Sequence, residues 1–167
     1  MSYLGVTKTA MDMLKSALIK RGKLSVKVTF DSERFSKIFA VTSSGALNLS
    51  AVVKKGIKYG QFKRLAEEIP FTTGDWSTVL NLNERTMQRY KNEQKTFDPI
   101  YSDKILQIAI LYKTGNEVFG DKLSFDTWLE TKSIALGGKK PKELLDNTFG
   151  ISLVKDELLR IENGILA

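Results

Sequence analysis

The most informative part of this chain is residues 73–91, which read TGDWSTVLNLNERTMQRYK. Trp76 and Leu80 lie four positions apart, a spacing that places two apolar side chains on the same face of a helix. Met87 and Tyr90 lie three positions apart and predict the inner face of a second helix. The stretch therefore predicts two short helices that follow each other closely along the chain.

The link between these two helices has the chemistry of a tight turn. Asn81 can adopt the left-handed backbone that such a turn requires, and Asn83 is a good N-cap for the second helix. Thr73 is the expected N-cap of the first helix, and Val79 completes its buried face. Two short helices joined in this way suit a helix-turn-helix, in which the second helix enters the major groove of DNA.

The outward face of the second helix carries residues that could read DNA. Arginine pairs with guanine, glutamine pairs with adenine, and lysine neutralises phosphates, so the residue types on this face fit base reading. An ordinary solvated helix face would carry the same residue types, and the pattern alone leaves both interpretations open. The residues expected to contact DNA are Asn83, Arg85, Thr86, Gln88, Arg89 and Lys91.

The composition excludes several classes of enzyme. The 167 residues include no Cys and no His, which removes thiolate nucleophiles, the commonest general base and the commonest zinc ligand. Carboxylate chemistry is also unfavoured, because the acidic residues near the end of the chain are spaced as on solvated helix faces. Those residues are Asp146, Asp156, Glu157 and Glu162. We therefore expect no enzymatic activity, no metal site and no cofactor.

The net charge of +7 is unevenly distributed. Residues 1–70 hold 13 Lys and Arg against 5 Asp and Glu, whereas residues 71–167 hold 13 against 14. The basic excess fits nucleic-acid contact and fits a lysine-rich solvated surface equally well. Lys8, Asp12 and Lys15 interrupt what would be the apolar core of a signal peptide, and no apolar run approaches membrane-spanning length. We expect a cytoplasmic protein with no membrane contact.

The remaining signals are mostly helical, so the expected fold class is mainly α. Residues 24–30 alternate between apolar and polar side chains, which predicts a short strand near the N-terminus. Residues 1–46 form an extension of open role, ending in a polar linker. Beyond it we expect a helix capped by Ser50 that ends at Gly56, and a long helix capped by Ser102 that ends at Gly120. Three further helices are expected, one with Phe125 and Trp128, one through Leu145, and a last one with Leu153, Leu158 and Ile161.

From about Asn48 to its end, the chain resembles the Xre/MbcA/ParS antitoxin family of type II toxin–antitoxin systems. The residues that carry the resemblance are LNERTMQR at 82–89, EVFGD at 117–121, ALGG at 135–138, Pro141, ELLD at 143–146, RIE at 160–162 and Gly164. The chain departs from the family pattern at Asn81, where glycine is usual, and at Ile134, where proline is frequent. Residues 1–46 have no clear counterpart in the family.

The resemblance implies a helix-turn-helix domain at residues 47–120 and a small helical toxin-binding domain at residues 121–167. It implies toxin contact by Leu136, Gly137, Gly138, Pro141, Leu144, Leu145, Arg160, Ile161, Glu162, Gly164 and Ile165. The antitoxin would occlude the active site of a toxin, commonly an NAD-consuming RES-domain toxin, and would repress its own operon by binding promoter DNA as a homodimer. The alternative is a stand-alone transcriptional regulator whose C-terminal helices serve dimerisation or ligand sensing.

Overall fold

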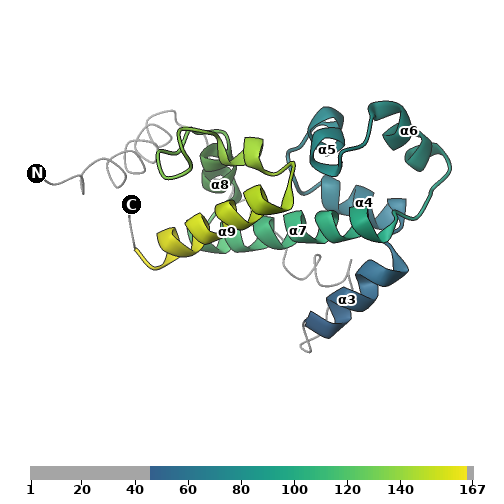
Figure 1. Ribbon diagram of the computed structural model, residues 1–167, viewed down its shortest axis with the longest axis horizontal. Coiled ribbons are helices and arrows are strands. Elements are labelled where there is room, and N and C mark those ends of the chain that lie inside the picture. The colour runs from purple at the N-terminus through teal and green to yellow at the C-terminus, as the bar shows by residue number, and fades with distance from the viewer. Residues whose placement is uncertain (1–45, 165–167) are drawn as a thin grey trace, which may run out of the picture.

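The computed structural model describes residues 46–164, with side chains from Leu49 onward, and this part of the chain is helical (Figure 1). The strand expected at residues 24–30 lies outside the described residues, and so does Ile165. The elements are α3 (Ala46–Lys55), α4 (Tyr59–Ala66), α5 (Thr73–Leu80), α6 (Glu84–Asn92), α7 (Pro99–Phe119), α8 (Lys122–Leu129), the 3-10 helix η2 (Pro141–Leu144) and α9 (Thr148–Glu162). The predicted fold class, a helix-turn-helix followed by a small helical domain, is confirmed. None of the helices in residues 46–164 is long and apolar enough to cross a membrane.

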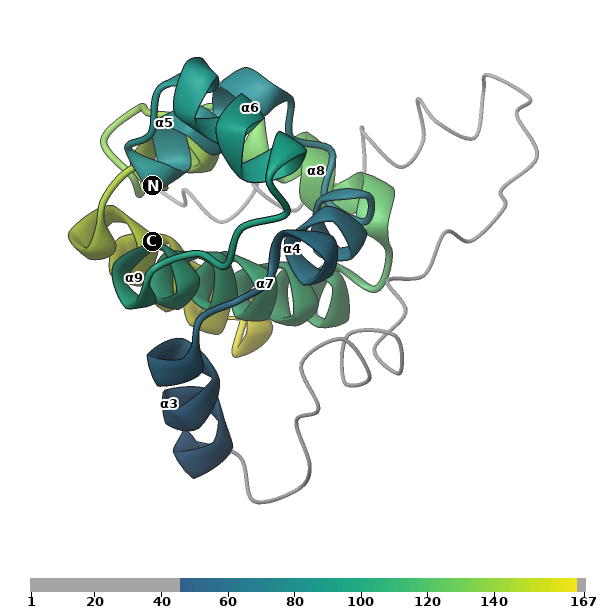
Figure 2. The same ribbon diagram turned by 90° about the vertical axis from the view of Figure 1, so that its right-hand side faces the viewer.

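The long helix α7 connects the two halves of the structure. It packs against α3, α5, α8 and α9; α9 lies alongside it in Figure 1, and α3 lies below it in both ribbon views (Figures 1 and 2). Ile105, Ile108, Leu111 and Tyr112 are fully buried on it. A helix that is apolar on several sides must be covered on several sides. Each half of the protein therefore depends on α7 for its core.

The start of α7 differs from the expectation. Ser102 does not cap the helix, because Asp98 occupies the N-cap position and Pro99 the first helical position, which proline's fixed φ favours. Ser102 is instead buried inside the first turn. Its hydroxyl donates to the Phe97 carbonyl and accepts from the Ile57 amide, both at 2.9 Å. The residue therefore holds the α3–α4 link against α7.

Other local expectations differ from the structure by small amounts. The N-cap of α5 is Thr72 rather than Thr73, and Ser50 lies inside α3 rather than capping it. The segment that precedes Leu145 is a 3-10 helix, which begins at Pro141. Gly56 and Gly120 follow their helices with φ of 81° and 76°, as the helix-stop interpretation predicted.

Side chains from both halves meet around Tyr112. Its ring makes edge contacts with Phe71 before α5, at 5.7 Å between ring centroids, and with Phe125 of α8, at 5.0 Å. Its hydroxyl donates to Asp126 at 3.1 Å. Lys104 of α7 makes a second link, since its ammonium donates to the carbonyls of Val79 in α5 and of Asp146 before α9. These contacts fix the orientation of the two halves.

A network of ion pairs also crosses the junction. The Lys142 ammonium lies 3.1 Å from the Asp75 carboxylate of α5 and 2.7 Å from that of Glu130, with the Phe71 ring 5.3 Å away. Partial burial raises the pKa of Asp75, but hydrogen bonds from Thr72 and Lys142 outweigh it and leave this pKa below its usual range. Lys142 lowers the pKa of Glu130 in the same way. Both carboxylates are therefore stabilised in the charged form.

This network predicts a weak loss of stability in acid. A carboxylate whose folded-state pKa is depressed contributes fully above its unfolded pKa of about 4, and the contribution is lost as the pH falls through the folded value. Differential scanning calorimetry between pH 5 and 3 should show a shallower fall of Tm for Lys142→Met than for the wild type. Because Glu130 is exposed and Asp75 and Lys142 are only half-buried, solvent screens these ion pairs, and the difference in stability should stay within about 1 kcal/mol. If Tm falls equally with pH in the wild type and in Lys142→Met, the ion pairs of Lys142 do not contribute to stability as described.

Candidate functional site

The helix-turn-helix predicted from residues 73–91 is formed by α5, a three-residue turn and α6. A capping box fixes the start of α5: the Thr72 hydroxyl accepts from the Asp75 amide at 3.1 Å, and the Asp75 carboxylate accepts from the Thr72 amide at 2.8 Å. Asn81 has φ 53° and ψ 40°, so the predicted left-handed turn is confirmed. The Asn83 side chain accepts from the Thr86 amide at 2.7 Å and caps α6 as expected.

The two faces of α6 separate as its spacing predicted. Met87 and Tyr90 are buried, and the Tyr90 ring stacks on Phe97 with 4.5 Å between centroids. The residues expected to contact DNA are exposed except for Thr86, which is half-buried; they are Asn83, Arg85, Gln88, Arg89 and Lys91. The Gln88 amide donates to Asn92 at 2.9 Å. Within residues 46–164, Arg85, Arg89 and Lys91 form no ion pair, so their charges are available to a partner.

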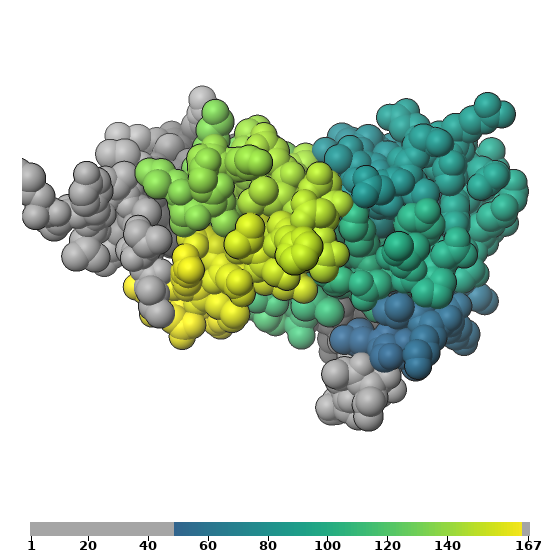
Figure 3. Space-filling view, in the orientation of Figure 1, coloured from purple at the N-terminus to yellow at the C-terminus, as the bar shows by residue number. Residues whose placement is uncertain are grey.

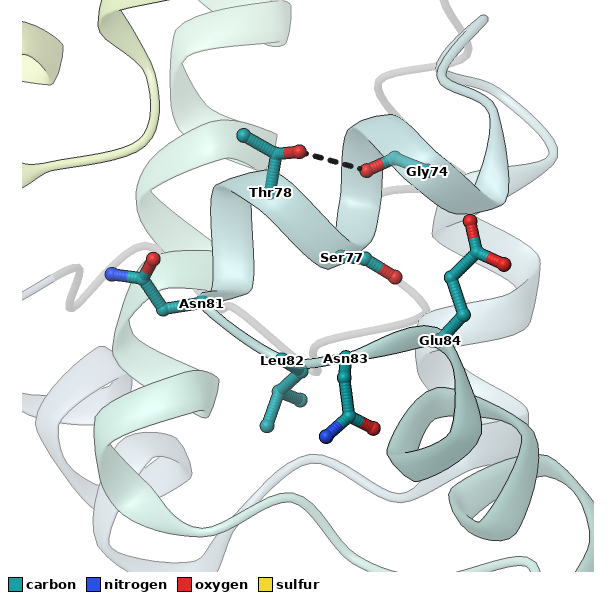
Figure 4. A pocket seen from close by; sticks show the side chains of 7 residues that line it. All are labelled: Gly74, Ser77, Thr78, Asn81, Leu82, Asn83 and Glu84. Carbon is teal, nitrogen blue, oxygen red and sulfur yellow. Dashed lines mark hydrogen bonds between the residues drawn. The ribbon is translucent and has the colours of Figure 1, made fainter.

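An open, shallow depression of about 540 Å³ lies beside the turn (Figure 4). Its lining is Gly74, Ser77, Thr78, Asn81, Leu82, Asn83 and Glu84. The Thr78 hydroxyl is already satisfied by the Gly74 carbonyl at 3.0 Å, and Glu84 is the one titratable group in the lining. Such a lining offers no nucleophile with a base beside it. In the described part of the chain, no group of acidic residues could hold a metal ion either.

A second candidate surface lies toward the other end of the long axis, away from α6 (Figure 1). Here Gly137 and Gly138 form a turn with φ of 68° and 75°, a conformation that side chains with a Cβ rarely adopt. The Gly138 amide donates to the Ser133 carbonyl at 2.8 Å, and the Ser133 amide donates to the Lys139 carbonyl at 3.0 Å. The Gly-Gly pair is therefore required by the backbone, and it brings residues 133 and 139 together.

The residues expected to contact a toxin divide into two groups. Pro141 and Leu145 are buried, and Leu136, Leu144 and Ile161 are half-buried. The exposed members are Gly137, Gly138, Arg160, Glu162 and Gly164. Pro141 and Leu145 have no side-chain surface to offer a partner, because both pack inside the domain. Their structural role is to hold η2 against α9 and α8.

The structure also exposes apolar residues that sequence reasoning did not select. Ile134 is 90% exposed, Phe149 85% and Leu153 54%, although Leu153 is one of the three apolar residues on which the last helix was predicted. Of that predicted set Leu158 is buried, and the inner face of the helix consists of Ile151, Val154 and Leu158. The 151–154–158 spacing of three and four already defines a complete helical stripe, and Leu153 falls off it. That spacing could have identified Leu153 as a surface residue.

Comparisons with known proteins agree with this division into two parts. Residues 49–109 match the antitoxin Xre-like helix-turn-helix domain, and residues 114–164 match the antitoxin Xre/MbcA/ParS C-terminal toxin-binding domain. A relative from Sphingobium sp. (strain YBL2), the Prs ADP-ribosylating antitoxin, is 26% identical over 125 residues, covering 70% of this chain and 79% of the relative. Residues 109 and 114 both lie within α7, so the two matched segments share one continuous helix.

Proposed function

Because the chain belongs to the Xre/MbcA/ParS antitoxin family and binds a cognate toxin through its C-terminal domain, we propose that it occludes the toxin's active site and represses its own operon. It is a type II antitoxin and not an enzyme. The observation that carries the proposal is the arrangement of two surfaces on α7. The arginines of α6, which form no ion pair with any residue of 46–164, lie toward one end of the long axis, and the Gly-Gly turn and the end of α9 lie toward the other. A stand-alone regulator is not favoured, because residues 114–164 match a toxin-binding domain.

The proposed toxin is an NAD-consuming protein of the RES-domain type. Family membership supports this pairing. The name of the Sphingobium relative links that antitoxin to ADP-ribosylation, a reaction in which NAD supplies the ADP-ribosyl group. Contact would involve the exposed turn at Gly137 and Gly138 and the exposed end of α9 at Arg160, Glu162 and Gly164. Ile165, which follows this segment in the sequence, would add an apolar side chain to the contact, and its burial against the toxin would stabilise the complex.

The proposed DNA contact uses α6 in the major groove. Arg85, Gln88 and Arg89 would reach base edges, and Lys91 would neutralise a phosphate. Asn83 and Thr86 hold the N-terminal turn of α6, the part of a recognition helix that lies closest to the bases. Residues 71–120, which include α5 and α6, hold 6 Lys and Arg against 6 Asp and Glu, so this region is not strongly basic. We therefore propose a homodimer that reads two half-sites, so that each subunit needs only modest affinity.

The arginines of α6 provide a direct test of DNA reading. Arg85→Ala and Arg89→Ala should each weaken binding to the chain's own promoter by about 1–3 kcal/mol, because each removes a bidentate contact to a base. Lys91→Ala should instead weaken binding to promoter and scrambled DNA alike, since a phosphate contact carries no sequence information. Fluorescence anisotropy at a fixed salt concentration measures the affinity of each variant for promoter DNA and for scrambled DNA. Unchanged promoter affinity in both arginine variants would show that α6 is not the recognition helix.

The toxin assignment is tested by co-expressing the full chain with the product of the adjacent open reading frame. If the neighbour alone arrests growth and depletes cellular NAD, and this chain reverses both, the proposal holds with its partner identified. If the neighbour arrests growth without depleting NAD and this chain reverses the arrest, the antitoxin function is supported and the pairing with a RES-domain toxin is contradicted. The intact chain is preferable to a truncated one, because Ile151, Val154 and Leu158 of α9 are buried in the shared core and their removal would uncover α7.

A further inference from the structure

Large apolar side chains are exposed mainly in the toxin-binding segment. Among the described residues, six large apolar side chains are at least half exposed: Ile100, Leu123, Ile134, Phe149, Leu153 and Leu159. Five of the six lie within residues 114–164, and only Ile100 belongs to the helix-turn-helix segment. Exposed apolar groups that gather in one domain indicate a binding surface of that domain.

Helix α9 carries two apolar faces, of which its own fold uses one. Ile151, Val154 and Leu158 are fully buried, and α9 packs on α7. Phe149 and Leu153 lie four positions apart, so their side chains share a side of the helix that the buried stripe does not occupy. Helix α9 covers the middle of the face seen in Figure 3. Phe149 and Leu153 therefore add nothing to the domain's core and are available to a partner.

The backbone that carries Phe149 is held firmly. The Asn147 side chain accepts from the Gly150 amide at 2.9 Å and caps α9. Gly150 packs directly on the Leu144 carbonyl, and the Lys104 ammonium binds the Asp146 carbonyl just before the helix. An aromatic side chain on a rigid helix start loses little conformational entropy when it is buried in a complex. This arrangement suits an anchor residue.

The charges farther along the same face indicate the chemistry of the partner. Asp156 is exposed and forms no ion pair with any described residue, whereas Arg160 is already paired with Glu157 at 3.6 Å. An uncompensated carboxylate three residues beyond Leu153 favours a partner with a cation next to its apolar pocket. A surface that combines an aromatic anchor, an aliphatic neighbour and one charge at its edge has the anatomy of a protein interface.

We propose that Phe149 and Leu153 anchor the toxin: they enter an apolar pocket on its surface, whose cationic rim faces Asp156. The proposal rests on the proposed function and adds to it a contact in the first half of α9, separate from the Gly-Gly turn and the end of the chain. The occupant is the toxin rather than a second copy of this chain, because the exposed apolar residues are concentrated in the domain that binds toxin.

The test compares the full chain with the double variant Phe149→Ser, Leu153→Ser, using the purified product of the adjacent open reading frame as the probe. Biolayer interferometry should show affinity at least about 30-fold weaker for the double variant, as expected when a hot spot is removed. The matched control is Ile100→Ser, which removes an equally exposed apolar side chain from the other domain and should change affinity by less than about twofold. Asp156→Lys should slow association by about threefold at low salt.

Three other outcomes would overturn the proposal. Equal affinity of the wild type and the double variant would place the toxin elsewhere on the domain while leaving the antitoxin function intact. Unchanged toxin affinity with a loss of dimers in analytical ultracentrifugation would assign the face to a second copy of this chain. Unchanged toxin affinity with a lower Tm would assign it to a contact within the chain. If the wild type itself fails to bind the probe, the proposed pairing with that neighbour fails first.

Discussion

Gly150→Val is expected to disrupt the toxin-binding domain. A Cβ at this position would lie 1.9 Å from the Leu144 carbonyl oxygen and 2.8 Å from its carbonyl carbon, and neither backbone atom can move without displacing η2. Overpacking in a close contact costs typically 1–3 kcal/mol and sometimes more, and valine adds two methyl groups to the clash. We therefore expect the free energy of unfolding to fall by about 3 kcal/mol, measured by urea denaturation.

The functional consequence of Gly150→Val should be selective. The start of α9 would separate from η2, and Lys142 of η2 would be displaced from Glu130 and Asp75. Toxin neutralisation should therefore be lost. The matched control is Gly60→Ala in α4, where an added Cβ meets nothing within 4 Å. Alanine there should raise stability by up to about 1 kcal/mol, because it favours the helix. A Gly150→Val protein as stable as the wild type would mean that η2 and α9 do not pack as described.

Tyr112→Ala should have a similarly large effect, and it should affect both domains at once. Tyr112 is fully buried on α7, between Phe71 of the helix-turn-helix half and Phe125 of the toxin-binding half. Removing a buried aromatic side chain costs about 3–5 kcal/mol, because the cavity that it leaves collapses only in part. The side chain joins the two halves. The Tm measured by circular dichroism and the Tm measured by tryptophan fluorescence should therefore fall by the same amount.

The variant Tyr112→Phe keeps the aromatic ring and removes only the hydroxyl, so it measures the contribution of the hydroxyl alone. Burial and the neighbouring Asp126 raise the pKa of Tyr112 above its usual range, so the hydroxyl stays a neutral donor to that carboxylate. The phenylalanine variant keeps both aromatic contacts and loses one hydrogen bond, worth about 1 kcal/mol. Equal stability of Tyr112→Ala and Tyr112→Phe would contradict the packing.

Local chemistry made much of the helix-turn-helix predictable. The left-handed turn at Asn81, the cap at Asn83 and the inner face at Met87 and Tyr90 were all found where the spacing placed them. Each depends on residues within one or two helical turns. The same reasoning placed the α5 cap one residue too late and took Ser102 for a cap, since a hydroxyl near a helix start can also be enclosed by a distant segment such as the Ile57 backbone.

The sequence by itself determined the helical class, the position of the turn and the family resemblance. Helix capping, turn conformation and motif order all depend on residues that are close together in the sequence. Only the tertiary structure decided which residues of the C-terminal domain remain at the surface. Pro141 and Leu145 became buried, whereas Phe149 and Leu153 stayed exposed, although all four are apolar. The difference arises because η2 packs between α8 and α9 and α9 turns one side toward α7, and the area that each side chain buries depends on those distant neighbours.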